Sequence, residues 1–480
     1  MSARVFILIM SLVSFAYRCV LMRLADLQRR RPLPAEVADV FEPERYQTYL
    51  NYTADNRRFS VVQRIVTLVI DTAVWFSPLF GAVERAAGGN AYVIFLLTFL
   101  VFWAVETVCD VIFGWYDTFR IEEKYGLNKK DGREFAKDEI IEAVTSFLLI
   151  GVLGLILTFF GEHLPVWTGG RSVGAAKAVL TGAVIAGVIA LFFVLATLFS
   201  YRILRLRYTF TPLPEGPLRD EIMRLQEGSK KQVHEIYVYN ESKKSTSKNA
   251  FLLKLFFHRE FGIADNFLTG NSERELLAVL SHEVGHLKHK KTVLNIITYA
   301  VPVLLFVILI ALIARPQPVL ALTAWVRTSF GVVSNNYYAL ISVVISVLLP
   351  VIRVAGIFSN YRSRSEEYEA DREAVKNGYG EELIETFKRV SSDELVNVDP
   401  HPAIEILEYN HPGMYRRIKA IREAADALEY VPEGYRPAEP AGEAADAPAD
   451  EEAAETPAYE AAVPAGPEEG PAEDPQKEES

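Results

Sequence analysis

Residues 281–289 read SHEVGHLKH and contain the pattern His-Glu-x-x-His at His282, Glu283 and His286. A helix places positions i and i+4 on one face, so the two histidines can reach one metal ion. Glu283 can then take a proton from a water that zinc makes acidic near neutral pH. Chance would produce about 0.01 such patterns in a chain with so few histidines. The pattern therefore indicates a zinc peptidase site rather than a helix with two ordinary histidines.

The residues before this pattern predict the helix that the chemistry needs. Residues 272–275 (SERE) form a capping box, which starts a helix ten residues before His282. The apolar residues that follow recur with helical spacing and supply a buried stripe, which consists of Leu276, Leu277, Val279, Leu280, Val284 and Leu287.

A catalytic zinc ion takes three protein ligands and keeps a fourth position for water. A metzincin continuation would need Gly and His where the chain has His289 and Thr292, which excludes that class; we expect His289 to face solvent. Glu367 and Asp371 are better placed, because they share one face of a second predicted helix. Glu367 as third ligand and Asp371 as acceptor for a ligand-histidine N–H would complete the site. The alternative is an acidic, solvated helix face.

Half of the 480 residues are apolar, and seven apolar runs approach or exceed the length that crosses a bilayer: residues 5–21, 61–83, 91–116, 140–160, 175–199, 293–314 and 333–358. The first run lacks a small-residue cleavage site, so we interpret it as a membrane anchor rather than a signal peptide. Asp71, Glu106 and Asp110 fall inside these runs and are expected to face a bundle interior or a water-filled cavity.

The loops between the runs differ in positive charge. Loop 22–60 holds seven arginines and loop 119–139 holds six Lys or Arg, whereas loops 84–90, 161–174 and 315–332 hold one or two each. The positive-inside rule therefore places the N-terminus outside, and the zinc helix and the C-terminus in the cytoplasm.

The formal net charge of −11 comes from the C-terminal tail, because residues 438–480 hold 14 acidic residues and one lysine. This Ala/Pro/Glu-rich tail is predicted to be disordered. The two cysteines fall inside predicted spans without metal-ligand spacing. Since no basic patch with interleaved aromatics occurs, the sequence does not indicate nucleic-acid binding.

The part between the fifth and sixth runs is predicted to be a small α+β domain. We expect a short helix over 216–227, strands over 235–239, 249–253 and 261–268, and completing helices over 361–378 and 381–427. An exposed edge strand beside the zinc could bind an extended peptide through main-chain hydrogen bonds. The predicted organisation is spans one to five in 1–200, the peptidase domain in 201–292, two further spans in 293–358, the remaining peptidase helices in 359–430 and the tail in 431–480.

These motifs resemble those of the type I CAAX prenyl proteases, a family of integral-membrane zinc endopeptidases, over about residues 1–430. Besides the two zinc motifs, residues 121–128 (IEEKYGLN) match a family signature, and residues 247–251 (SKNAF) resemble its substrate-strand motif with Lys248 inserted. His411-Pro412 followed by Arg417 resembles the family's closing motif, from which Gly413 and Arg416 depart.

The resemblance implies a mainly α fold, a seven-span transmembrane helical bundle around a water-filled chamber, with a small cytoplasmic α+β zinc-peptidase domain of gluzincin-like type. His282, His286 and Glu367 would bind one Zn²⁺ ion, Glu283 would be the general base and acid, and Asp371 would orient a ligand histidine. Asn249, Ala250 and Arg417 would bind substrate, and His411 would stabilise the oxyanion. The substrate would be a peptide or protein, which is prenylated for the family's eukaryotic members, and the protein would lie in the lipid bilayer.

Two alternatives remain open at this point. A heat-shock-type quality-control protease would use the same zinc chemistry on damaged membrane proteins, although such chains usually carry fewer spans. A non-catalytic membrane scaffold or transporter could keep a vestigial zinc site, but the presence of all four active-site groups argues against it. The ligand set suits Zn²⁺, and other divalent ions can enter such a site.

Overall fold

The computed structural model describes residues 1–167, 175–227, 229, 232–255, 258–288 and 316–428. Among these, six helices are long and apolar enough to cross a membrane: α1 (Ala3–Arg29), α2 (Pro43–Phe76), α4 (Ala91–Tyr116), α5 (Gly132–Trp167), α6 (Ala175–Arg207) and α12 (Tyr337–Lys376). They coincide with six of the seven predicted spans. The seventh, residues 293–314, lies outside the described residues, as do His289 and the acidic tail.

The boundary predicted for the second span was wrong. The helix α2 ends at Phe76, and a separate helix, α3 (Leu79–Ala87), follows it. Proline disfavours helical geometry at the residue before it, and Ser77, which precedes Pro78, is extended with φ −70° and ψ 167°.

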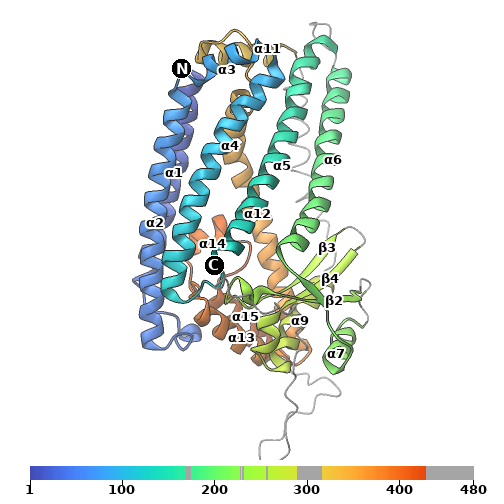
Figure 1. Cartoon of the computed structure of the whole chain (residues 1–480). Helices are drawn as coiled ribbons and strands as arrows, with labels where there is room; N and C mark the ends of the chain where they lie inside the picture. Colours follow the sequence, from blue (N-terminus) through green and yellow to red (C-terminus); the bar gives the residue numbers. More distant parts are fainter. Residues whose placement is uncertain (168–174, 228, 230–231, 256–257, 289–315, 429–480) are drawn as a thin grey trace, which may run out of the picture. The chain divides into compact units, whose positions relative to one another are not determined.

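The short elements gather at the two ends of these helices (Figure 1). The helices α3 and α11 (Pro316–Phe330) lie at the end that also holds the N-terminus, where Trp75, Phe80 and Phe330 pack together. The opposite end carries the sheet and the helices α9 (Glu273–Lys288), α13 (Gly380–Asp393) and α15 (Met414–Ala427). Short helical segments lie in the connections: η1 (Ala35–Val37), the π-helical η2 (Asp117–Glu122), η3 (Glu123–Tyr125) and η4 (Glu241–Lys243).

The sheet has four strands in the order β1-β2-β4-β3, which are β1 (Phe210–Pro212), β2 (Glu235–Tyr239), β3 (Ala250–Leu255) and β4 (His258–Ala264). β2 pairs in parallel with β4, and β3 pairs antiparallel with β4, with Phe251 opposite Gly262. β3 is therefore an edge strand, as the predicted peptide-binding mode requires. The strand predicted over 235–239 is confirmed. The strand predicted over 261–268 was too long, since Asp265 starts the helix α8 (Asp265–Thr269).

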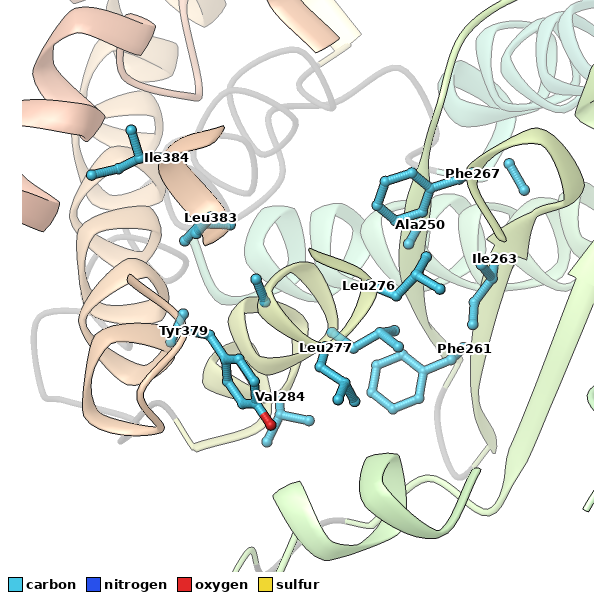
Figure 2. Packing of buried hydrophobic residues seen from close by; sticks show 14 of the residues in the cluster. Ala250, Phe261, Ile263, Phe267, Leu276, Leu277, Val284, Tyr379, Leu383 and Ile384 are labelled. Carbon is cyan, nitrogen blue, oxygen red and sulfur yellow. The ribbon is translucent and has the colours of Figure 1, made fainter. Parts of the chain in front are cut away.

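The remaining helices cover the sheet and complete its core. The helix α7 (Pro217–Leu225) matches the short helix predicted there, and the helix predicted over 361–378 is the continuation of α12. The helical region predicted over 381–427 consists of three helices, α13, α14 (Pro402–Glu408) and α15. Apolar side chains of α9, such as Leu277 and Val284, pack between Phe261 of the sheet and Leu383 of α13 (Figure 2). The core therefore fixes the helix that carries the His-Glu-x-x-His pattern.

Candidate active site

The capping box predicted before the zinc helix is confirmed. The Ser272 N–H donates to Glu275 Oε2 at 2.8 Å, and the Glu275 N–H donates to Ser272 Oγ at 3.4 Å. These bonds satisfy two main-chain donors that a helix start leaves unpaired. The register of α9 is thereby set ten residues before His282.

A glycine inside the motif lets α9 approach α12 closely. A Cβ atom on Gly285 would lie 2.7 Å from the Cα atom of Ala370, which is well inside van der Waals contact. Ala370 is fully buried and lies between Glu367 and Asp371 on α12. This contact brings the histidines of one helix next to the carboxylates of the other.

The three expected ligands converge. One ligand atom from each of His282, His286 and Glu367 lies within 4.8 Å of the others. Glu367 is 4% exposed, and its Oε2 atom accepts no well-aligned hydrogen bond from the described residues, although three nitrogen atoms lie near it: His411 Nδ1 at 3.0 Å, Arg417 Nη1 at 3.4 Å and His282 Nε2 at 3.5 Å. A buried carboxylate oxygen without a well-aligned hydrogen bond is costly, and a bound cation would reduce that cost. Two imidazoles and one carboxylate form a donor set that zinc takes in catalytic sites.

Asp371 links the ligand His282 to Arg417. Its Oδ1 atom is 2.9 Å from His282 Nδ1, and its two oxygens accept bonds from Arg417 Nη2 at 2.6 Å and from Arg417 Nε at 2.9 Å. All three side chains are buried. A carboxylate on the second nitrogen of a ligand histidine fixes the orientation of the ring, and the bidentate guanidinium fixes the carboxylate in turn.

The buried charges shift the protonation of this group. Burial lowers the pKa of His282, but hydrogen bonds to Asp371 and Glu367 outweigh it and raise that pKa to about 9. Burial likewise lowers the pKa of Arg417, while the charges of Asp371, Glu367 and Glu283 raise it above its ordinary value. The Arg417 side chain is therefore a permanent cation beside the ligand set.

The remaining expected residues lie around this centre. Glu283 is half-buried and close enough to Arg417 for their charges to interact. His411 is 58% exposed, and its loop is held by Arg364, which donates to the Glu405 and Tyr409 carbonyls at 2.8 and 2.5 Å.

Asn249 and Ala250 stand at the start of the edge strand. Asn249 is exposed and its carbonyl accepts the Ala264 N–H at 2.9 Å, whereas Ala250 is buried.

Two protein-family models match the chain. The CAAX prenyl protease N-terminal model, described as five membrane helices, matches residues 23–200, and the model for peptidase family M48 matches residues 212–425. The chain belongs to the M48 family and is of the CAAX prenyl protease type. It is therefore an integral, multi-pass membrane metalloendopeptidase. Membership also implies a bound metal, for which the convergent donors above are suited.

Individual M48 relatives match across most of their length. The probable CAAX prenyl protease 1 of Schizosaccharomyces pombe is 27% identical over 425 residues, which cover 82% of this chain and 83% of the relative. The CAAX prenyl protease 1 homolog of Oryza sativa subsp. japonica is 26% identical over 416 residues, which cover 83% and 92%. The crystal structure of S. mikatae Ste24p shares the fold, with a TM-score of 0.70 at 22% identity over 88% of this chain and 99% of that one.

The departures from the M48 closing motif have local explanations. A Cβ atom on Gly413 would lie 2.6 Å from the ring of Pro400, so the position has no room for a side chain. Arg416 donates to the buried Glu405 at 3.0 Å and compensates its charge. The support of the His411 loop by Arg364 was not predicted from the sequence. The position of Arg364, three residues before Glu367 in the same motif, was the one sequence feature that could have indicated it.

Proposed function

We propose that this M48 peptidase hydrolyses a peptide bond near the C-terminus of CAAX-type proteins, with one zinc ion held by His282, His286 and Glu367. The convergence of these three donors beside Glu283 carries the proposal. The names of the relatives, CAAX prenyl protease 1, support the substrate class. A bound zinc ion would supply Lewis-acid activation of water and of the scissile carbonyl.

The side chains of this chain would then divide the remaining work. Glu283 takes a proton from the attacking water and delivers it to the leaving amine. His411 donates toward the oxygen on which negative charge develops. Asp371, held by Arg417, keeps the ring of His282 in its orientation. Arg417 Nε and Nη2 both donate to Asp371. We therefore assign Arg417 to the support of the metal ligands rather than to direct contact with the substrate.

The edge strand β3 offers the surface for substrate. An extended peptide can add to its free side through main-chain hydrogen bonds, and this mode leaves side-chain pockets to decide specificity. Asn249 and Ala250 at the start of β3 would hold the substrate backbone. The peptidase elements lie at the end of the helices that carries loops 22–60 and 119–139, which supports a cytoplasmic active site.

The deciding experiment is cleavage of a farnesylated Cys-a-a-X peptide by the detergent-purified protein. We expect cleavage after the lipidated cysteine, and a kcat at least about 100-fold lower for Glu283→Gln. Glu369→Gln, an exposed change on α12, is the matched control and should keep wild-type activity. Equal cleavage of an unprenylated peptide would move the role toward quality control, and no cleavage of either peptide would reject the proposal.

A further inference from the structure

The segment that leads into the edge strand, residues 245–248, is held by a carboxylate from the residue that follows α13. Ser247 Oγ and the Lys248 main-chain N–H both donate to one oxygen, Glu394 Oε1, at 3.0 and 2.9 Å. Asn266 Nδ2 donates to the Ser247 carbonyl at 2.8 Å. Side chains therefore hold the hydroxyl and carbonyl of Ser247 and the main-chain N–H of Lys248.

The backbone around Glu394 is strained. Leu395, the next residue, has φ 54° and is the one non-glycine residue with positive φ among those that the structure describes. Such a conformation persists only where the surroundings impose it, and the Leu395 side chain is 3% exposed in the domain core. This left-handed residue comes directly after Glu394, whose carboxylate accepts the bond from Ser247.

The loop between α4 and α5 holds the same segment from a second side. Asn128 and Ser245 form an isolated antiparallel β-bridge, and the Lys129 N–H donates to the Lys244 carbonyl at 3.2 Å. Asn128 is buried, and its amide donates to Glu123 at 2.8 Å while its oxygen accepts the Lys130 N–H at 2.8 Å. Asn128 is the last residue of the signature IEEKYGLN, which the proposed chemistry leaves without a role.

Lys244, the residue before this segment, strengthens the contact with the loop between α4 and α5. Lys244 is 4% exposed, and its ammonium group lies 2.6 Å from Asp138 on α5 and 3.8 Å from Glu134. The segment is thus tied to a membrane helix at one point and to α13 at another. An edge strand has neighbours on one side only, so its register and rigidity depend on such ties.

We propose that Glu394 and Asn128 are positioning residues that clamp residues 245–248 and so hold β3 ready for an extended substrate. The inference rests on the proposed function, because it assigns to β3 the role of substrate strand. Pre-ordering the strand removes an entropic cost from peptide binding. Loss of the clamp should therefore weaken substrate binding and leave the metal donors in place.

The test compares Glu394→Ala, Glu394→Gln and Asp393→Ala in the full-length, zinc-loaded protein. Ser247 Oγ and the Lys248 N–H both donate to a single oxygen of Glu394. The amide oxygen of the glutamine variant can still accept both bonds, so this variant should keep a near-wild-type KM. The alanine variant loses both hydrogen bonds and should raise KM at least about tenfold, with kcat and zinc content unchanged. Asp393 pairs with the Lys248 ammonium group at 3.0 Å and leaves both donors to Glu394 in place, so Asp393→Ala removes a more exposed side-chain contact to the same segment and should raise KM less than Glu394→Ala.

A second pair of variants tests the other side of the clamp. Asn128→Ala should also raise KM. Lys129→Ala should leave KM unchanged, because the Lys129 side chain is exposed and the main-chain bond of this residue to Lys244 remains. Hydrogen–deuterium exchange of residues 245–251 gives a readout that needs no activity, and exchange should accelerate in Glu394→Ala and in Asn128→Ala.

Unchanged KM and unchanged exchange in Glu394→Ala would overturn the inference, as would an equal KM rise in Asp393→Ala. If the wild-type protein fails to cleave the farnesylated peptide, the proposed function falls, and the exchange result still decides whether the clamp orders β3.

Discussion

Asp371 is the residue through which the ligand His282 meets the permanent cation Arg417. Replacing it by asparagine keeps the shape but removes the negative charge that lies nearest to the buried guanidinium. We expect Asp371→Asn to lower zinc affinity about 10- to 100-fold and to cost about 3–5 kcal/mol of unfolding free energy, because it breaks a buried ion pair. Competition with a zinc-binding dye and thermal unfolding in detergent measure the two effects, with Glu369→Gln as control. A variant with wild-type zinc affinity would contradict the orienting role.

The raised pKa of His282 predicts how metal binding depends on pH. Its folded-state pKa of about 9 lies above the ordinary 6.5, so in the metal-free protein its contribution to stability is full below pH 6.5 and is lost as the pH rises through 9. Metal binding requires the neutral ring. Zinc affinity should therefore rise by up to about tenfold per pH unit between 6.5 and 9 and then level off.

Zinc competition titrations at several pH values between 6.5 and 9.5 check this dependence. In Asp371→Asn the His282 ring loses the carboxylate that raises its pKa. The rise of zinc affinity should therefore begin and level off at lower pH. An affinity that does not change with pH in the wild-type protein would show that His282 is already neutral before the metal binds.

The site residues differ in how far the sequence alone could predict them. His282 and His286 follow from spacing within one helix, and Glu367 with Asp371 from spacing within another; the structure brings these four together. The contact of Asp371 with Arg417 joins residues 46 positions apart on different helices, and no local pattern encodes such a pair. The motif alone predicts a substrate role for Arg417, and the contact with Asp371 becomes visible only in the structure.

At the scale of elements, the approach of α9 to α12 decides whether the donors can meet. Gly285→Ala would place a methyl group 2.7 Å from the Ala370 main chain. We expect a loss of about 1–3 kcal/mol of unfolding free energy, as for other overpacked contacts, together with weaker zinc binding. Gly356→Ala on α12 is the control, because nothing lies within 4 Å of its added Cβ atom. If Gly285→Ala unfolds and binds zinc like the wild type, the helices have room that the structure does not show.

Element boundaries were predictable where local chemistry decides them. The alternation of Glu235–Tyr239 predicts β2 with its correct ends, and the capping box predicts the start of α9. Within residues 381–427, α14 begins at Pro402, because proline is favoured at the first helical position, and Pro412 lies in the break between α14 and α15. The left-handed conformation of Leu395 had no such signal, because it is imposed by the packing of its side chain rather than by its own preference.

At the scale of the whole chain, the side of the membrane that holds the active site decides which substrates can reach it. The alternation of basic loops predicts that the peptidase end is cytoplasmic, and direct contacts tie that end to the basic loops: Arg45 Nε donates to the Ser392 carbonyl at 2.9 Å, and Lys244 pairs with Asp138. Two single-cysteine variants, in a protein without Cys19 and Cys109, distinguish the orientations.

Lys129→Cys lies in the loop at the peptidase end, and Ala86→Cys lies on α3 at the opposite end; both positions are exposed. In intact cells a membrane-impermeant maleimide should label Ala86→Cys at once and Lys129→Cys only after permeabilisation. The reverse pattern would place the peptidase site outside the cell's cytoplasm. It would also remove cytoplasmic CAAX-type proteins from the possible substrates, because the scissile bond would then have to reach the site from the other side of the bilayer.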